Sequence, residues 1–256
     1  MKKEDLMYYA SDDEEKIFLS KVFDKYNATY MRGYTTFTNF LDMKKQYLIE
    51  KAFSANSDVA VKFYGGYEKA ERKISAFFNN PCEEIEFPVK TLKIKVYNIK
   101  KLTHRDFLGS LMSLGIEREM IGDIVISDYA YVFVCEKIGD YILNNLTKIA
   151  GQGAEVSYYD GEALTPDVKE KTVHATVSSL RLDCVVGAGF NLSREKSSAI
   201  ISSGNVMLNF SVCQNRDAKI KEEDVISVRG HGRIIVKRTG GLSKKGRNII
   251  ELSIPQ

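Results

Sequence analysis

Few cysteines and no long apolar run are found in this sequence. The cysteines show no Cys-x-x-Cys spacing and no histidine at ligand spacing, which favours reduced, buried thiols over a metal site or a disulfide; they are Cys82, Cys135, Cys184 and Cys213. No stretch approaches the roughly 18 apolar residues that a membrane helix needs. Acidic residues stand near the start in place of an apolar signal core. We therefore expect a cytoplasmic protein with no membrane span, metal or cofactor.

Length and charge distribution give the first positive evidence. With 256 residues, 44% of them apolar and 28% charged, the chain has material for about two domains of roughly 150 residues. Residues 178–256 hold 13 Lys or Arg and 7 Asp or Glu, a net charge of +6, whereas the whole chain has +3. The rest of the chain therefore carries −3. The C-terminal part is the one suited to a polyanionic partner.

The basic part begins with two predicted helices. Ser193 is a good N-cap residue, and Arg194 and Lys196 fall in the first turn of the helix that it starts, which Gly204 ends. Apolar residues recur at helical spacing on both helices: Leu182, Val185 and Val186 on the first, Ala199, Ile200 and Ile201 on the second. The apolar period then changes to two, which predicts strands at 206–208, 225–228 and 234–236. A helix pair followed by a small sheet is the expected local fold.

Charge and helix geometry together favour phosphate binding at this helix pair. The free amides of a helix N-terminus and the side chains of Arg194 and Lys196 suit the same phosphate oxygens. Charge alone fits a solvated basic face on an ordinary domain equally well. The same two readings apply to the basic segment 240–247, which is expected to form a hairpin or loop.

Residues 91–159 alternate strand and helix patterns in the order β-α-β-β-α-β, which predicts a ferredoxin-like fold of the kind that RNA-recognition motifs use. The strands are expected at 92–97, 124–126, 130–134 and 154–159, and the helices at 105–114 and 137–149. By parity, one face of the central strands packs on the helices through Leu92, Ile94, Val96, Ala130, Val132 and Val134. The opposite face carries possible base-stacking side chains beside two lysines: Tyr97, Tyr129, Tyr131 and Phe133, with Lys93 and Lys95. The alternative is that the N-terminal helices or another domain cover these rings.

The remaining segments set the expected domain boundaries. The N-terminal region reads as helical, with a first helix capped within 11–13 and a second opening at Thr38 or Asn39. Gly65 and Gly66 fit a simple turn better than a phosphate-binding loop, because no P-loop pattern surrounds them. We expect domains at 1–80, 81–160 and 177–256 and a linker at 161–176, within which Val173, Ala175 and Val177 alternate as in a strand.

A series of short motifs runs through the basic part in a specific order. It consists of Leu180-Arg181-Leu182-Asp183, Phe190-Asn191-Leu192-Ser193-Arg194, Ile200-Ile201 with Gly204 and Val206, Asn209, the segment 224–230, and Gly232-Arg233. In order and spacing the series resembles the S4-type RNA-binding domain, although Phe210 and Glu223 stand where that family has glycine. The resemblance implies that the helix pair and an adjacent strand present a basic face to structured RNA. The matching positions are Arg181, Ser193, Arg194, Lys196 and Ser197.

One subgroup of S4-type proteins is similar over most of the chain. The aromatic Phe210 after Asn209 and the segment 229–233 are similar to the YlmH proteins, with His231 where an aromatic residue is expected. Further similar segments are 37–41, 63–67, 70–73 and 104–123. The resemblance implies an α+β protein with a helical N-terminal segment, a ferredoxin-like middle domain and a C-terminal S4-type domain. It also implies contacts with ribosomal RNA and tRNA on the large ribosomal subunit, in the rescue of stalled large subunits.

Other function classes fit the residues less well or stay open. Pseudouridine synthases also carry this module, but they need a catalytic Asp in Gly-Arg-Leu-Asp before Thr or Ser and Gly-Leu, and here Asp183 is followed by Cys184-Val185-Val186. The motifs of a tRNA synthetase are absent as well, while a cell-division adaptor stays open. We predict a monomeric RNA-binding protein that is not an enzyme. Its predicted RNA contacts are Arg181, Ser193, Arg194, Lys196, Ser197, Arg229, Arg233 and Lys237.

Overall fold

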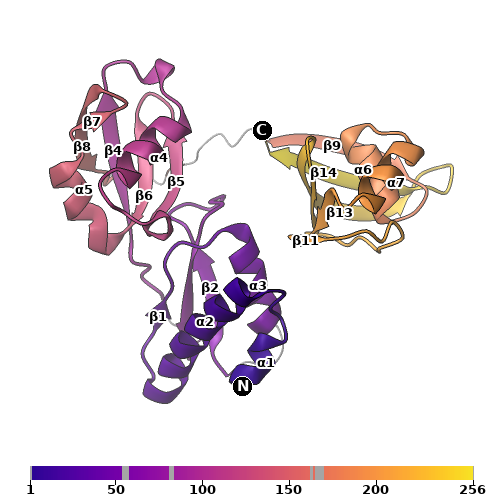
Figure 1. Ribbon diagram of the computed structural model, residues 1–256, viewed down its shortest axis with the longest axis horizontal. Helices are drawn as coiled ribbons and strands as arrows, with labels where there is room; N and C mark the ends of the chain where they lie inside the picture. The colour runs from indigo at the N-terminus through magenta and orange to yellow at the C-terminus, as the bar shows by residue number, and fades with distance from the viewer. Residues whose placement is uncertain (1, 54–57, 81–83, 162–163, 165–169, 256) are drawn as a thin grey trace. The chain divides into compact units, whose positions relative to one another are not determined.

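The computed structural model describes residues 2–53, 58–80, 84–161, 164 and 170–255. The chain divides into two compact units, Met1–Pro166 and Asp167–Gln256 (Figure 1). Both units combine helices with antiparallel sheets. The expected α+β class is therefore confirmed.

The N-terminal part of the first unit forms three helices and a three-stranded sheet. The helices are α1 (Lys3–Met7), α2 (Asp13–Arg32) and α3 (Met43–Phe53), and the strands are β1 (Thr36–Phe37), β2 (Ala60–Tyr64) and β3 (Ile74–Phe78), in the order β1-β3-β2. Asp12 caps α2 by accepting from the Glu15 amide at 2.8 Å, and Gly33 ends it in the left-handed conformation. The apolar sides of α2 and α3 pack with the sheet around Tyr26 and Phe77.

This sheet corrects the prediction of a purely helical N-terminal region. β3 is buried at all 5 of its positions, so its apolar run lacks the alternation by which a strand is recognised. The predicted start of the second long helix is wrong too, because the Lys45 amide donates to the Asp42 carboxylate at 2.9 Å at the start of α3. The hydroxyl of Thr38 instead pairs with that of Ser75 at 3.1 Å, inside the sheet.

A five-stranded antiparallel sheet forms the rest of the first unit. Its strands are β4 (Val89–Val96), β5 (Ile121–Ile126), β6 (Ala130–Cys135), β7 (Lys148–Ile149) and β8 (Gln152–Tyr158), in the order β5-β6-β4-β8-β7. They are connected through α4 (His104–Met112), α5 (Gly139–Asn145) and the 3-10 turns η1 (Ile99–Lys101), η2 (Arg118–Met120) and η3 (Glu136–Ile138). β4 and β6 are central neighbours, as predicted for the first and third strands. The predicted helix at 137–149 is shorter, because the chain turns extended at Leu146 and enters β7.

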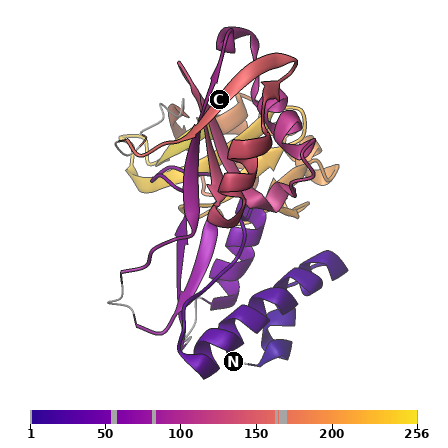
Figure 2. The same cartoon turned by 90° about the vertical axis from the view of Figure 1, so that its left-hand side faces the viewer.

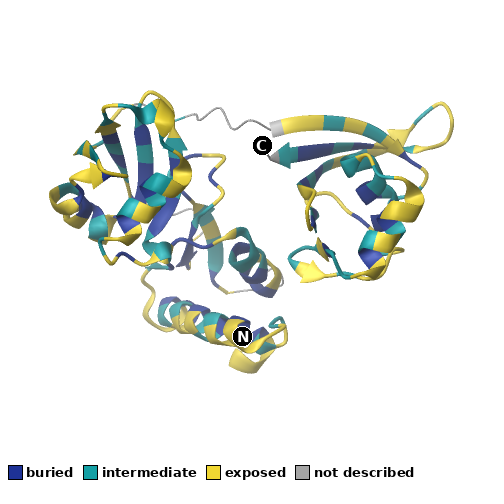
Figure 3. Ribbon diagram, turned by 45° about the horizontal axis from the view of Figure 1, so that its top comes forward, coloured by how far each residue is buried: buried dark blue, intermediate teal, exposed yellow. Residues whose placement is uncertain are grey.

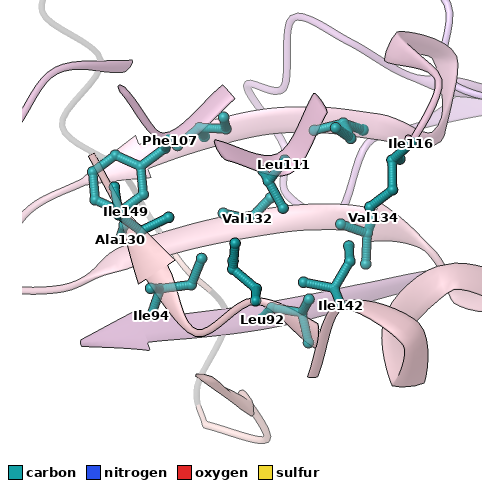
Figure 4. Packing of buried hydrophobic residues seen from close by; sticks show 13 residues of the cluster. Leu92, Ile94, Phe107, Leu111, Ile116, Ala130, Val132, Val134, Ile142 and Ile149 are labelled. Atoms are coloured by element: carbon teal, nitrogen blue, oxygen red, sulfur yellow. The ribbon is translucent and has the colours of Figure 1, made fainter. Parts of the chain in front are cut away.

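One face of this sheet forms the core of the middle part. The inward side chains of the two central strands pack against Phe107 and Leu111 of α4 and Ile142 of α5; they are Leu92, Ile94, Ala130, Val132 and Val134 (Figure 4). Figure 2 shows these helices gathered on one side of the strands. Each fully buried aliphatic side chain contributes roughly 1.5–3 kcal/mol. The predicted parity is confirmed, and it leaves the opposite face for solvent or for another segment.

The N-terminal part docks beside β5 and β6 of this sheet. The Asp123 carboxylate on β5 accepts from the Tyr67 hydroxyl at 2.8 Å and from the amides of Glu71 and Arg72 at 2.7 and 3.1 Å. The Arg72 guanidinium also donates to the Ile121 carbonyl at 3.0 Å. These bonds explain why the two expected domains at 1–80 and 81–160 form one compact unit.

The C-terminal unit places a helix pair on a six-stranded sheet. Its elements are β9 (Glu170–Val177), α6 (Leu182–Phe190), α7 (Arg194–Ser202), β10 (Val206–Leu208), β11 (Ser211–Val212), β12 (Val225–Val228), β13 (Gly232–Leu242) and β14 (Asn248–Pro255). The strand order is β11-β10-β12-β13-β14-β9. Val185, Val186 and Ile201 of the helices are fully buried in the core. The predicted helix pair and following strands are confirmed.

The predicted linker is too long at its C-terminal end. β9 begins at Glu170 and pairs with β14 along its whole length. The alternating residues Val173, Ala175 and Val177 pack against the core of the unit. The alternation thus marks a strand of the sheet, and residues 170–176 belong to the C-terminal unit.

Two turns of this unit place residues other than glycine in the left-handed backbone conformation that glycine favours. Asn209 and Phe210, the two-residue loop between β10 and β11, have φ angles of 49° and 68°, and Glu223 has 65°. Such left-handed residues cost about 1–2 kcal/mol each. The Asn209 side chain offsets part of this cost, because it accepts from the Val225 amide at 2.9 Å and donates to Asp224 at 2.8 Å.

Two findings bear on the expectations from composition. Within the part of the chain that the structure describes, no helix combines the length and the apolar character that a bilayer crossing requires. Cys135 is buried, as expected, whereas Cys184 and Cys213 are only partly buried, and all three are free thiols. Cys82 lies outside the described residues.

Candidate nucleic-acid interface

The N-terminus of α7 presents cations beside its first turn. Ser193 is the N-cap, as predicted, and its hydroxyl accepts from the Lys196 amide at 3.3 Å. Arg194 and Lys196 are exposed, and the side chain of Arg194 is 78% accessible. Glu195 is exposed in the same turn. The Ser193 hydroxyl is thus committed to the cap, and the two cations face solvent.

A buried carboxylate anchors the cations at this end of the helix pair. The Asp183 side chain is only 1% exposed and receives two bonds from the Arg181 guanidinium, at 3.1 and 2.8 Å. It also accepts from the Cys184 amide at 2.9 Å and lies 3.9 Å from the Arg194 Nε. Burial alone raises the pKa of Asp183, but the hydrogen bonds from Arg181 and Cys184 outweigh burial and lower it. Asp183 therefore stays ionised at neutral pH and fixes Arg181 in place.

A loop distant in sequence joins this group. Arg181 and Lys219 form an isolated antiparallel bridge, and the Arg181 Nη2 lies 2.5 Å from Asp217, which is also 4.0 Å from the Arg216 Nε. We call this set the helix-pair surface: Arg181, Arg194, Lys196, Arg216 and Lys219, with Asp183, Asp217 and Glu195. Five cations and three carboxylates leave a net charge of +2. Sequence reasoning missed Arg216 and Lys219, because only tertiary pairing brings their loop to α6.

The three predicted cations at the helix pair are not equivalent. Arg181 is 31% exposed and pairs with both Asp183 and Asp217, so much of its charge is compensated inside the protein. Arg194 is far more exposed, and among the described residues its one ion pair is the long contact to Asp183. Arg194 and Lys196 are consequently the cations that the structure offers to a ligand, while Arg181 mainly holds the surface together.

Ser197 is a correction to the predicted contacts. The residue is fully buried, and its hydroxyl donates to the Ser193 carbonyl at 3.0 Å. A Cβ atom at Gly187 of α6 would lie 3.1 Å from the Ser197 Oγ, so the two helices approach closely at this point. The small serine serves helix packing, and it has no surface on which RNA can rest.

The other predicted cations lie on a different part of the unit. Arg229 is exposed in the turn after β12, Arg233 pairs with Ser227 across the β12–β13 ladder, and Lys237 lies in a bulge of β13. These three positions therefore belong to the strands and turns of the sheet, outside the helix pair itself.

In the middle part, several tyrosines share the sheet face that α4 and α5 leave uncovered. The Lys93 Nζ lies 3.7 Å above the Tyr129 ring, and the Tyr131 ring meets the Tyr159 ring edge-on at 4.9 Å. We call Lys93, Tyr129, Tyr131 and Tyr159 the tyrosine surface. Tyr97, at 99% exposure, extends alone beyond the end of β4. Tyr159 lies at the end of the predicted strand 154–159, but it was missed because the parity argument covered only the two central strands.

Phe133 does not belong to this surface. It is only 1% exposed, and the ring of Tyr67 covers it at a centroid distance of 5.0 Å. A Cβ atom at Gly66 would come within 2.1 Å of the Phe133 ring, so only glycine allows the N-terminal part to approach this closely. Base stacking by Phe133 is therefore wrong. The ring is covered, as the alternative expected, but by the loop between β2 and β3 and not by an N-terminal helix. Gly65 and Gly66 shape a packing contact and a turn.

No metal cluster appears in the residues that the structure describes: no three or more His, Cys, Asp or Glu side chains gather in a suitable arrangement. The candidate chemistry of both surfaces consists of cations, backbone amides and aromatic rings. That combination suits phosphates and bases.

Comparison with known proteins places the chain in a family. Residues 81–161 match the family described as "Putative RNA-binding domain in YlmH". The chain is 30% identical over 239 residues to the Bacillus subtilis (strain 168) "Ribosome-associated protein quality control protein P2", covering 91% of this chain and 93% of that protein. The chain belongs to the YlmH family. A solved YlmH structure, described as "Cell division protein ylmH from Streptococcus pneumoniae", is 20% identical with a TM-score of 0.50 and covers 59% of this chain and 93% of its own, which supports the fold.

Proposed function

We propose that this YlmH-family chain is a non-enzymatic RNA-binding protein that acts on structured RNA at the ribosome. Its RNA partners are ribosomal RNA and tRNA on the large subunit, and its role is the rescue of stalled large subunits. The name of the Bacillus subtilis relative, a ribosome-associated quality control protein, supports this role. The description of the family that matches residues 81–161 supports RNA as the ligand.

The observation that carries the proposal is the helix-pair surface. The exposed N-terminus of α7 carries Arg194 and Lys196 in its first turn, and buried Asp183 lies near Arg194. Free amides and cations at one helix end suit phosphate oxygens. We interpret the C-terminal unit as an S4-type domain in which Arg194 and Lys196 contact the RNA backbone and Arg181 keeps the helix pair in register. Arg229, Arg233 and Lys237 extend the basic area over the sheet.

The tyrosine surface is proposed as a second RNA contact, on a middle domain of ferredoxin-like, RRM-like topology. Rings on an open sheet stack on bases with about 1–3 kcal/mol per base. Tyr131 lies in the central strand β6 and Tyr129 directly precedes that strand, while Tyr97 and Tyr159 follow the ends of β4 and β8. Photocrosslinking of RNA to Tyr129 or Tyr131, located by mass spectrometry, is the expected result. Crosslinks confined to the C-terminal unit would contradict it.

The helix-pair surface is tested by charge reversal. Arg194→Glu with Lys196→Glu is expected to weaken cosedimentation with purified Bacillus subtilis large ribosomal subunits at least about tenfold, or about 1.4 kcal/mol. Lys2→Glu with Lys3→Glu is the matched control, because it makes the same change in net charge at two exposed positions outside the proposed surfaces. Circular dichroism melting verifies that both variants stay folded.

Unchanged cosedimentation of the folded double variant would count against the proposal. The alternative of an RNA-modifying enzyme is tested separately. The chain is incubated with total RNA, and the nucleosides are analysed by mass spectrometry. We expect no altered nucleoside, and a new modified nucleoside would overturn the non-enzymatic assignment. A monomeric, cytoplasmic protein is part of the same proposal, and light scattering checks its oligomeric state.

A further inference from the structure

The long hairpin of the C-terminal unit ends in an ordered turn. β13 and β14 continue past a register shift between Gly240 and Leu242, and the Leu242–Asn248 pair is the last one before the loop. The Ser243 amide donates to the Arg247 carbonyl and the Gly246 amide to the Ser243 carbonyl, both at 2.8 Å. We call residues 238–247 the arm. The turn at its tip has a defined shape that holds its side chains outward.

The arm carries positive charge without compensation at its tip. Residues 237–250 contain five Lys or Arg and no Asp or Glu: Lys237, Arg238, Lys244, Lys245 and Arg247. Lys244 and Lys245 occupy the middle of the turn, both are exposed, and neither forms an ion pair with any residue that the structure describes. Figure 3 draws the loop at the end of the hairpin as exposed. A basic turn that contacts no acid of its own unit is free to meet an external anion.

Gly240 gives a second, independent indication. Glycine inside a strand costs about 0.5–1 kcal/mol relative to alanine. At Gly241 the positive φ of 60° in the bulge explains the residue, but Gly240 has no positive φ and a Cβ atom there would meet nothing within 4 Å. The fold therefore does not require glycine at 240. A glycine that packing does not explain often marks a place where a ligand or another backbone approaches closely.

The tip end of the arm lies beside the end of β9, which leads into the helix pair. Asn248 pairs with Val177 of β9, and the Arg247 guanidinium donates to the Thr176 carbonyl at 2.9 Å. Arg181 follows Val177 by only four residues and anchors the helix-pair surface. The arm and that surface therefore lie in the same unit and are separated by only a short segment of chain, which lets a single RNA reach both.

We propose that the arm is a second phosphate-binding element, which grips the sugar-phosphate backbone of the same RNA that the helix-pair surface holds. This inference rests on the proposed function. The bare backbone at Gly240 admits the RNA strand, and Lys244 and Lys245 contact its phosphates. Because such contacts carry no sequence information, the arm adds affinity and orientation, and it does not select a base.

The test measures affinity and its salt dependence in the full-length protein. Lys244→Ala with Lys245→Ala is expected to weaken binding to total tRNA, followed by fluorescence anisotropy, about fivefold at moderate salt. The slope of log K against log salt should fall by about 1.5, since each lost phosphate contact removes about 0.7–0.9. Lys2→Ala with Lys3→Ala should change neither quantity. An unchanged slope and affinity in the arm variant would overturn the inference.

A substitution at Gly240 tests the close approach of the RNA strand separately from the effect of charge. Gly240→Leu keeps the net charge and meets open space in the fold, so circular dichroism should show an unchanged melting temperature within about 2 °C. We expect it to weaken tRNA binding about threefold, whereas Leu242→Ala, beside it on the arm, should not. Normal binding by folded Gly240→Leu would refute the close approach.

The comparison with Arg194→Glu/Lys196→Glu distinguishes the two proposals. Loss of binding in both the helix-pair and the arm variants supports both. Loss in the helix-pair variant alone refutes the arm and leaves the proposed function standing. Loss in the arm variant alone supports the arm and refutes the helix-pair surface, and normal binding by both variants refutes both assignments.

Discussion

The helix-pair surface and the tyrosine surface are exposed for different physical reasons. In the C-terminal unit, the buried carboxylate of Asp183 in the first turn of α6 holds Arg181, which directly precedes that helix, and lies near Arg194 at the start of α7. In the middle part, exposure depends on a distant segment: the face of β6 is covered at Phe133, where Tyr67 docks, and partly open at Tyr129 and Tyr131. Local sequence therefore specifies the helix-pair part of the first surface, namely Arg181, Arg194 and Lys196, whereas the extent of the second surface is set by tertiary docking.

The two ends of β6 give the largest predicted contrast. Phe133→Ala should lower the free energy of unfolding of the first unit by about 3–5 kcal/mol, because it removes a buried ring and leaves a cavity under Tyr67. Tyr129→Ala, directly before β6 and on the same side of the sheet, should change it by no more than about 0.5 kcal/mol. Urea denaturation with hydrogen exchange read by mass spectrometry resolves the unit that is affected.

Equal destabilisation by the two substitutions would remove the distinction between a covered and an open end. A second outcome concerns docking. If Phe133→Ala changed hydrogen exchange only within β6 and left the segment around Tyr67 protected, the N-terminal part would not depend on the Phe133 contact for its docking.

A smaller effect tests how the helix-pair surface is held. Asp183→Ala should destabilise the C-terminal unit by about 1–2 kcal/mol, because Arg181 loses its buried partner but keeps contact with water. Asp217→Ala is the control: Asp217 pairs with the same arginine but its side chain is 55% exposed, so a loss below about 0.5 kcal/mol is expected. The two losses are compared by hydrogen exchange at neutral pH.

Low pH should remove the stabilisation that ionised Asp183 gives to the C-terminal unit. The pKa of Asp183 lies below the ordinary value of about 3.9, so its stabilisation is fully present above that value and is lost as the pH falls through the lower, folded value. The difference in stability between the native chain and Asp183→Asn should thus be constant from pH 7 to about pH 5 and shrink below pH 4. A difference that grows on acidification would contradict the assigned ionisation of Asp183.

What could be predicted from the sequence follows from the range of the interactions. The helix pair, the cap at Ser193 and the parity of β4 and β6 depend on neighbours within a few residues, and all are confirmed. The three-stranded N-terminal sheet was missed, since β3 is buried on both faces and its pattern lacks a period. Burial of Ser197 and Phe133 and recruitment of Arg216 depend on segments that pack only in three dimensions. No local sequence pattern predicts such contacts.

Turn conformation gives the smallest predicted effect. Both parts use glycine at left-handed positions, such as Gly151 in the middle part and Gly204 in the C-terminal unit, but Glu223 holds a φ of 65° without being glycine. Glu223→Gly should stabilise that unit by about 0.5 kcal/mol, because relief of about 1–2 kcal/mol of strain exceeds the added chain entropy of about 0.5–1 kcal/mol. Glu223→Ala loses the same carboxylate but keeps the strain, so it should not stabilise, and hydrogen exchange compares the two. Stabilisation by both would show that the carboxylate is unfavourable there and that the turn stores no strain.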